Sequence, residues 1–245
     1  NYCLQSRCNV HNGQLAKTIH PIAKQIVTRA NQSIAEFGPI FEALGLTDTQ
    51  DPEKMKKNMD ERKQNSPKAE KQRQALREAI AFKKYEFDAH GVEMNHRYKS
   101  NSVLTEGDKE PEFKKDKELF YQPTTYPGAR IPHAWVYDKT GVKHSLLDLC
   151  GKGNFSILTG IGGEEWLKAA KNIETQLGIK FQCNIIGPDQ DFEDHAGEWS
   201  SIREISDSGL ILVRPDQHIC WRSKDMIPNS SEKLMDVMKK ILHKR

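Results

Sequence analysis

The glycine-rich turn at residues 160–163 carries the residue types that could most directly do chemistry. It follows an apolar run, residues 155–159, and precedes a segment with helical spacing. A turn between a strand and a helix can present backbone N–H groups to a phosphate. However, the turn has only part of the glycine pattern of a dinucleotide site, and Glu164 and Glu165 would repel the phosphate. We therefore interpret these residues as a structural turn.

The same position is where disulfide oxidoreductases carry their thiols, because a helix N-terminus lowers the pKa of a cysteine. No cysteine stands there. The chain's cysteines are odd in number and form no Cys-x-x-Cys pair, which predicts reduced, buried thiols in a cytoplasmic protein. They are Cys3, Cys8, Cys150, Cys183 and Cys220.

Other catalytic and metal-binding patterns are missing from the sequence. No two histidines have the i, i+4 spacing of a zinc protease helix. The acidic run at residues 189–194 has Asp194 where a calcium loop requires glycine. No Gly-x-Ser-x-Gly elbow is present. We therefore predict no catalytic, cofactor-binding or metal-binding residue in this chain.

Composition argues against two classes of partner. The net charge of +3 over 245 residues is small for a protein dedicated to nucleic acid. Residues 51–84 contain 11 Lys or Arg and 6 Asp or Glu, which we interpret as the solvated surface of a helical hairpin broken near residues 65–67. No apolar run approaches the length of a membrane span.

The first residue is Asn rather than Met, and we expect the chain to be a fragment.

The elements that must hold these residues are clearest from residue 133 onward. Apolar spacing and turn residues predict a hairpin, a strand, a helix, a parallel strand, a second hairpin and a closing helix. This is the order of a thioredoxin-like domain in the α/β class. The predicted segments are 134–137 and 142–149, 155–159, a helix from Trp166 ended by Gly178, 179–186, 210–213 and 218–221, and a helix behind Ser230 and Ser231.

The earlier part of the chain is predicted to be more irregular. Residues 19–44 show helical spacing that Gly38 and Pro39 should interrupt. Residues 85–87 and 92–98 are predicted as short strands, and residues 105–118, which are charged and contain proline, as a linker.

Two groups of residues are expected to be structural. In the turn at residues 214–217, Gln217 takes a position where glycine would relieve strain. The large apolar side chains of the tryptophans predict anchors in the core or at a domain interface. These are Trp135, Trp166, Trp199 and Trp221.

Several motifs together resemble the C-terminal part of flavin-dependent phenol hydroxylases, most closely the chlorophenol monooxygenases. The resemblance is continuous from about Ile22 to the C-terminus. Its motifs lie at residues 23–31, 85–91, 121–128, 127–135 and 208–222.

The resemblance implies an enzyme that uses FAD and NADPH to hydroxylate a phenolic substrate ortho to its hydroxyl group. Residues 1–46 would be the C-terminal helices of a truncated FAD-binding domain. Residues 47–127 would form a helical hairpin, short strands and a linker, and residues 128–245 a thioredoxin-like domain without Cys-x-x-Cys. Because the flavin fingerprint is missing, we expect this chain alone to bind neither cofactor and to have no activity. A homodimer is a family expectation.

The resemblance also suggests where this chain meets the rest of the enzyme. Tyr85, His90 and Tyr98 lie in the segment nearest the expected flavin domain, so we predict interdomain or substrate-side contacts for them. The alternative interpretation is a redox-silent thioredoxin-like module that works alone in binding or dimerisation.

Overall fold

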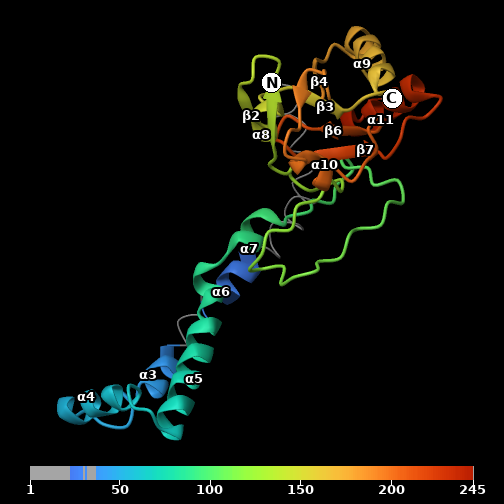
Figure 1. Ribbon diagram of the computed structural model, residues 1–245. Helices are drawn as coiled ribbons and strands as arrows, with labels where there is room; N and C mark the ends of the chain where they lie inside the picture. Colours follow the sequence, from blue (N-terminus) through green and yellow to red (C-terminus); the bar gives the residue numbers. More distant parts are fainter. Residues whose placement is uncertain (1–22, 30, 32–36, 245) are drawn as a thin grey trace. The chain divides into compact units, whose positions relative to one another are not determined.

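A computed structural model describes residues 23–29, 31 and 37–244 of the chain. They belong to two compact units (Figure 1). The helical unit comprises Ile19–Glu93 and Lys115–Tyr121, and the sheet unit includes Met94–Lys114 and Gln122–Arg245. Residues 23–29 are helical, but most of the first predicted helix before residue 37 lies outside the described residues.

The first fully described helix corrects one prediction. Helix α3 (Phe37–Ala43) contains Gly38 and Pro39, which we expected to interrupt the helix. Pro39 instead lies in the first turn of α3, where its missing N–H removes no intrahelical hydrogen bond.

The predicted break between two helices in the basic segment is confirmed. Helix α4 (Pro52–Glu61) begins behind Asp51, whose carboxylate accepts from the backbone N–H of Glu53. Helix α5 (Pro67–Phe82) begins behind Ser66 in the same way. Each helix combines a side-chain cap with proline in its first turn, two features that favour the start of a helix.

The predicted short strands at residues 85–87 and 92–98 are wrong. The chain forms helix α6 (Lys84–Phe87) and helix α7 (His90–Met94) there. Lys83, which ends α5, keeps right-handed helical dihedral angles and so leads directly into α6. The strand preference of the aromatic residues is weaker than this continuation of helical backbone.

The sheet unit is built around a four-stranded sheet in the order β4-β3-β6-β7. β3 pairs in parallel with β4, because a helix crosses between them, and antiparallel with β6, which forms a hairpin with β7. The predicted order of strand, helix, strand, hairpin and helix is thus present. Its elements are β3 (Phe155–Thr159), α9 (Glu164–Leu177), β4 (Phe181–Ile185), β6 (Leu210–Val213), β7 (Ile219–Ser223) and α11 (Ser230–Leu242).

A second, three-stranded antiparallel sheet has the order β2-β1-β5. Its first two strands are the predicted hairpin around residues 138–141, although a short helix replaces the end of the second predicted strand. Two short helices lie in the same part of the chain. The elements are β1 (Trp135–Asp138), β2 (Lys143–Ser145), α8 (Leu146–Leu149), β5 (Phe192–Glu193) and α10 (Glu198–Ile202).

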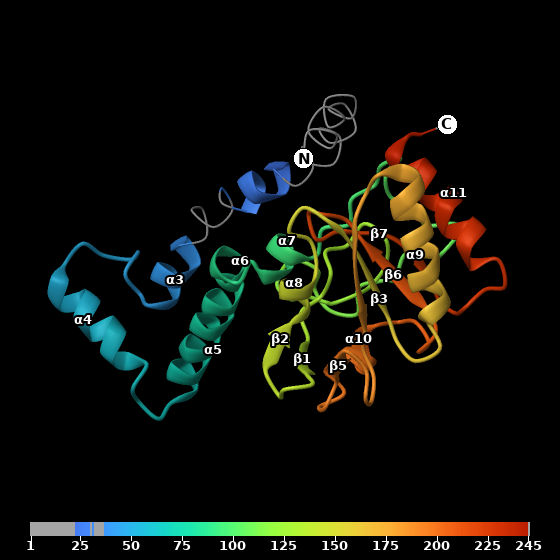
Figure 2. The same cartoon turned by 90° about the horizontal axis from the view of Figure 1, so that it is seen from above.

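Both faces of the four-stranded sheet are buried. Helices α9 and α11 lie side by side against one face (Figure 2). Side chains from the β1–β2 hairpin, α8 and α10 pack against the other face. Side chains alternate accordingly: Ile157 and Leu212 belong to the first core cluster, while Leu158 and Ile211 belong to the second. This explains why β3 and β6 have continuous apolar sequences.

Three of the four predicted tryptophan anchors are confirmed. Trp166, Trp199 and Trp221 are almost fully buried. Trp166 and Trp221 pack edge to face, with ring centroids 5.9 Å apart. Trp135 is only half-buried, and the Nζ atom of Lys143 lies 4.3 Å from its ring centroid.

The ends of the two long helices agree only in part with prediction. Gly178 ends α9 in the left-handed conformation, with φ +65°, as predicted. Helix α11 begins at Ser230, and its cap position is occupied by Asn229 without a side-chain cap bond. Ser230 and Ser231 are therefore not caps, because both already lie inside the first turn.

Both outer strands of the four-stranded sheet have partners for their backbone groups. The Gly128 N–H donates to the Ile219 carbonyl at 2.7 Å, and the Leu104 N–H donates to Cys220 at 2.8 Å, so other segments cover β7. On β4, the N–H groups of Phe181 and Ile185 are bound by the carboxylates of Glu174 and Asp191. Covered or carboxylate-blocked edges resist pairing with another strand.

Candidate functional site

Tyr85 is held in the helical unit by a group of charged residues. Its hydroxyl donates to Asp116, and the guanidinium of Arg29 lies 5.2 Å from its ring centroid. The hydrogen bond to Asp116 and the burial of the phenol raise the pKa of Tyr85. Arg29, which is buried, also donates to Glu118 at 2.6 Å. These contacts tie Tyr85 and Arg29 to residues 116–118 within the helical unit.

The other two residues predicted as contacts have separate surroundings. His90 begins α7 and packs against Tyr121, with ring centroids 5.6 Å apart. Tyr98 belongs to the sheet unit and packs edge to face against His218 at 4.8 Å. His90 thus has its ring neighbour within the helical unit, and Tyr98 has its ring neighbour within the sheet unit.

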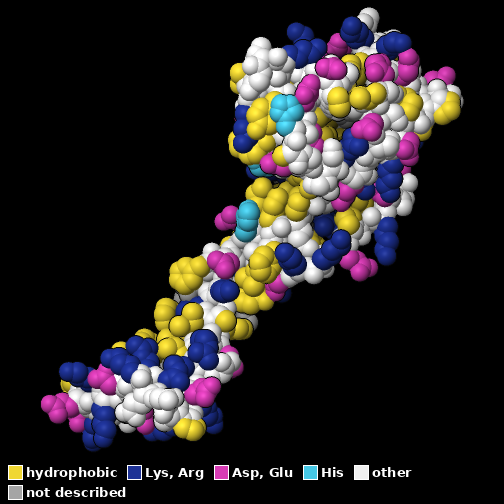
Figure 3. Space-filling model, viewed as in Figure 1, with side chains coloured by type: hydrophobic (Ala, Val, Ile, Leu, Met, Phe, Trp, Pro, Cys, Tyr) yellow, Lys and Arg dark blue, Asp and Glu magenta, His cyan; other side chains and the backbone are white. Residues whose placement is uncertain are grey.

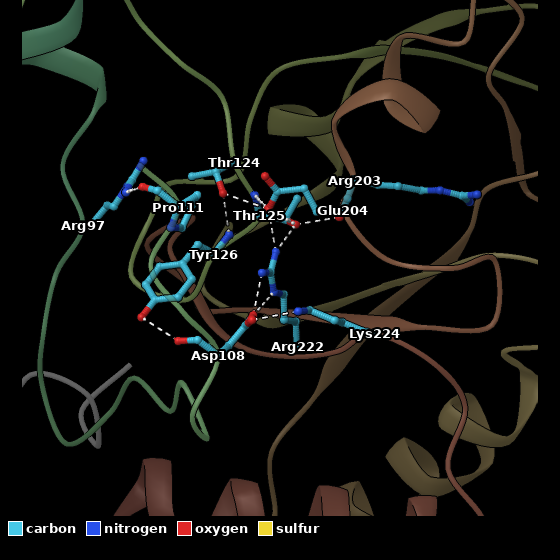
Figure 4. Close-up of polar contacts among 10 residues, drawn as sticks. All are labelled: Arg97, Asp108, Pro111, Thr124, Thr125, Tyr126, Arg203, Glu204, Arg222 and Lys224. Carbon is cyan, nitrogen blue, oxygen red and sulfur yellow. Dashed lines mark hydrogen bonds and ion pairs between the residues drawn. The ribbon is translucent and has the colours of Figure 1, made fainter. Parts of the chain in front are cut away.

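The strongest polar cluster of the sheet unit centres on Arg222 in β7 (Figure 4). Its guanidinium donates to Asp108 Oδ2 from Nε at 2.8 Å and from Nη2 at 2.5 Å. From Nη1 it donates to Glu204 Oε2 at 2.6 Å. Because the Arg222 side chain is only 6% exposed, these bonds replace nearly all of its hydration.

A loop just before the second sheet completes the cluster. Thr124 donates from Oγ1 to Glu204 at 2.8 Å, and the Thr125 N–H donates to the same carboxylate at 3.1 Å. Thr125 Oγ1 accepts from Arg222 at 2.8 Å and donates to the Arg203 carbonyl at 2.6 Å. Figure 4 shows these side chains converging on Arg222 from segments far apart in the sequence.

Asp108 carries a second cation. Lys224 Nζ lies 2.8 Å from Asp108 Oδ1. Burial raises the pKa of Asp108, but the hydrogen bonds from Lys224 and Arg222 outweigh burial, so this pKa lies below its ordinary value of 3.8. The carboxylate is therefore charged at neutral pH and holds its loop against β7.

A parallel contact lies one residue earlier on β7. The indole N–H of Trp221 donates to Glu106 Oε2 at 2.9 Å, and Lys233 of α11 binds Glu106 Oε1 at 2.6 Å. Arg97, whose side chain is 7% exposed, donates to the Pro111 carbonyl at 2.5 Å. Residues 97–111 are thus anchored along the sheet unit at several points.

Sequence reasoning missed this cluster. The linker predicted at residues 105–118 does lack helix and strand, but its first part is bound through Glu106 and Asp108. One signal was available: Arg222 follows three apolar residues in a buried strand, and a charge there needs a partner. Nothing in the sequence identifies Asp108, which is 114 residues away, as that partner.

The side chains of this cluster are arranged to hold segments of the sheet unit together and not to catalyse a reaction. Its donors and acceptors bind one another, and the guanidinium of Arg222 is held by Asp108, Glu204 and Thr125 together. Among the described residues, no group of three or more His, Cys, Asp or Glu side chains could hold a metal ion.

The glycine-rich turn supports the structural interpretation. A Cβ atom at Gly163 would lie 1.9 Å from Thr159 Oγ1, and one at Gly160 would lie 2.6 Å from the Asp207 carbonyl oxygen. The Gly162 N–H donates to the Glu164 carboxylate at 3.4 Å. The Glu164 carboxylate thus accepts a hydrogen bond from a backbone N–H group of the kind that binds phosphate at other helix N-termini.

The cysteine side chains of the sheet unit are wholly or partly buried from solvent. Cys150 and Cys220 are fully buried, Cys183 is half-buried, and all three are free. Burial raises the pKa of Cys150 to about 12 and that of Cys183 to about 11. Burial also raises the pKa of Cys220. The predicted burial is confirmed for Cys150 and Cys220 but only in part for Cys183. Cys3 and Cys8 lie outside the described residues.

We expect Cys183 to react with a maleimide at pH 8 about a hundredfold more slowly than the same thiol in unfolded chain, because its thiolate is scarcer. The rate should rise steadily up to about pH 11. Since folding raises this pKa from 9.0, the thiol stabilises the fold fully below pH 9, and that contribution is lost as the pH rises through 11. Peptide-resolved mass spectrometry measures the rate, and a plateau near pH 9 in native protein would contradict the expectation.

Comparisons with known proteins agree with this architecture. The C-terminal domain of aromatic-ring hydroxylases is recognised over residues 124–244. The chain is 47% identical to 2,4-dichlorophenol 6-monooxygenase of Delftia acidovorans over 91% of this chain and 38% of that protein. It is 44% identical to phenol 2-monooxygenase of Pseudomonas sp. strain EST1001 over 89% of this chain and 36% of that protein.

A solved structure is similar to this chain. The flavin-dependent monooxygenase PieE, crystallised with FAD and substrate, is 38% identical and superimposes with a TM-score of 0.82. The superposition covers 92% of this chain and 38% of PieE. In the described residues, no helix combines the length and the apolar character needed to cross a membrane. Residues 124–244 therefore belong to the aromatic-ring hydroxylase family, and the chain corresponds to a C-terminal portion of its phenol and chlorophenol monooxygenases.

Proposed function

We propose that this chain is the C-terminal part of an enzyme that uses FAD and NADPH to hydroxylate a phenol ortho to its hydroxyl group. The observation that carries the proposal is 47% identity over 91% of the chain to a 2,4-dichlorophenol 6-monooxygenase. The chain spans less than two fifths of the length of the curated relatives named above. The substrate and the cofactors of the whole enzyme are therefore proposals by similarity.

Within such an enzyme, the sheet unit serves assembly. Residues 128–245 form a thioredoxin-like domain without redox activity, residues 47–127 connect it, and residues 1–46 are the end of the FAD-binding domain. The order of β3, α9, β4, β6, β7 and α11 supports the first assignment. Glu164 at the glycine-rich turn supports the expectation that this chain alone binds neither FAD nor NADPH.

The proposal has three further parts. Tyr85, His90 and Tyr98 contact the flavin-binding part or the substrate side. The enzyme is a homodimer, as the resemblance suggests. It works in the cytoplasm, which the free thiols of Cys150, Cys183 and Cys220 support, since a reducing compartment keeps thiols unpaired.

A hybrid enzyme tests the proposal. The upstream portion of the Delftia acidovorans relative is joined to this chain, and FAD content and NADPH-dependent hydroxylation of phenol and 2,4-dichlorophenol are measured. We expect the hybrid to hydroxylate a phenol and the chain alone to show no saturable FAD binding. A hybrid that folds with FAD but consumes no phenol would contradict the proposed function. Tight FAD binding by the chain alone would contradict the expectation that this chain does not bind the cofactor by itself.

The alternative of a stand-alone binding or dimerisation module gains no support from these comparisons. The relatives named above are monooxygenases by name.

A further inference from the structure

Helix α3 exposes a pair of aromatic side chains. Phe37 and Phe41 are four residues apart, so they lie on the same side of the helix. Their rings are stacked with centroids 6.2 Å apart, yet the two residues remain 45% and 46% exposed. Paired phenyl rings in water are typical of a binding surface.

Few apolar side chains are buried among the described residues of the helical unit. Helices α3 and α4 have no buried residue, and α5 has only Ala69. Both hydrophobic core clusters consist of residues of the sheet unit. Figure 3 shows hydrophobic side chains along the helices of the helical unit. Its exposed large hydrophobic residues are Ile26, Val27, Phe37, Phe41, Ile80, Phe82, Phe87 and Phe120.

We propose that the Phe37–Phe41 face of α3 packs against the portion of the enzyme that lies upstream of this chain. The inference rests on the proposed function, because it takes its partner from the longer hydroxylases. Burying two phenyl rings removes apolar surface from water, and this stabilises the contact.

The length of the relatives favours this occupant. This chain is similar to PieE with a TM-score of 0.82, but the matched region is only 38% of PieE. The greater part of that flavin-dependent chain lies outside the match and is large enough to cover the exposed helices. A unit with so few buried apolar residues needs such a cover, because small cores stabilise little.

Charge argues against a second copy as the occupant. Residues 51–84, which follow α3 in the sequence, contain 11 Lys or Arg against 6 Asp or Glu. A two-fold contact through this face would bring the basic segments of two copies toward each other. Two such surfaces repel each other.

Cysteine accessibility tests the docking surface without relying on activity. Phe41→Cys is made in this chain and in the hybrid with the upstream portion of the Delftia acidovorans relative. Ile161→Cys is the matched control, since Ile161 is 47% exposed but lies in the sheet unit. Maleimide labelling is followed peptide by peptide, and the buried Cys220 reports folding because it stays unlabelled in native protein. Phe37→Cys serves as a second variant on the same face.

In this chain alone, we expect Phe41→Cys and Ile161→Cys to label at similar rates. In the hybrid, Phe41→Cys should label at least about tenfold more slowly while Ile161→Cys is unchanged, since reaction of a covered thiol requires opening of the contact. Equal labelling of Phe41→Cys in hybrid and isolated chain would overturn the proposal. Protection in the isolated chain that disappears on dilution would also overturn it, by identifying a second copy as the occupant.

The two proposals can fail separately. An active hybrid with a freely labelled Phe41→Cys would refute the docking surface and leave the hydroxylase function intact. A protected Phe41→Cys in a hybrid that binds FAD but does not hydroxylate would support the docking surface and refute the proposed activity.

Discussion

Replacement of Arg222 by methionine is expected to lower the free energy of unfolding by about 3 kcal/mol, because removing one partner leaves buried charges without compensation. The Arg222 side chain is 6% exposed, and it neutralises Asp108 and Glu204 together. Methionine has a similar length but offers no donor. Residues 104–126 should then separate from β7 more readily.

Lys224 provides the matched control for this substitution. It binds the same carboxylate, Asp108, at 2.8 Å, but its side chain is 59% exposed. Lys224→Met should therefore cost less than about 1 kcal/mol, as for other exposed ion pairs. Urea unfolding followed by tryptophan fluorescence measures both variants. Equal effects of the two substitutions would show that burial does not decide the strength of this cluster.

The same cluster predicts a dependence of stability on acid. The pKa of Asp108 is lowered from 3.8 in the folded chain, so its stabilising contribution is present above about pH 4 and is lost as the pH falls through the lower folded value. In Arg222→Met, the pKa of Asp108 should rise, so its stabilising contribution should be smaller and its loss should be complete at a higher pH. Unfolding curves recorded between pH 3 and pH 7 would reveal the difference; identical acid profiles for both proteins would refute it.

Substitution of Gly128 by alanine is expected to destabilise the sheet unit by about 3 kcal/mol or more, because strain and overlap act together. Gly128 has φ +100°, and a Cβ atom there would lie 2.4 Å from the Tyr98 carbonyl oxygen. The Gly128 N–H also bonds to Ile219 in β7, so the backbone cannot move away without loss of that bond.

Gly141→Ala separates strain from overlap. Gly141 has φ +81°, but nothing lies within 4 Å of the position that a Cβ atom would take. Alanine there should cost only about 1–2 kcal/mol, the penalty of a left-handed backbone. Thermal unfolding of both variants measures the two costs. If Gly128→Ala were no worse than Gly141→Ala, the close approach of Tyr98 would not constrain the fold.

Much of the sheet unit could be predicted from local patterns. The apolar run of β3, the helical spacing of α9 and its end at Gly178 are properties of neighbouring residues, and each is present as predicted. The strain predicted at Gln217 is present too, with φ +67°. Its side-chain amide donates to the Leu147 carbonyl at 2.7 Å, a contact that holds the strained turn.

Residue types were less informative where the same residues are compatible with two different local structures. The aromatic and apolar residues at 85–87 suit a strand, yet they form α6 because the backbone of Lys83 continues the preceding helix. The cap of α11 was misplaced for a similar reason, since Asn229 and Ser230 are equally good candidates by residue type. Such choices depend on the direction in which the chain enters the element.

The sequence by itself determined the alternation of elements in the sheet unit, the absence of thiols at its glycine-rich turn and the similarity to phenol hydroxylases. Only the tertiary structure decided which charges meet. Arg222 needed a carboxylate because it lies in a buried strand, but Asp108 becomes that partner through a loop whose path no local pattern encodes. Periodicity describes which face of an element is buried, whereas a contact across 114 residues depends on how the whole chain packs.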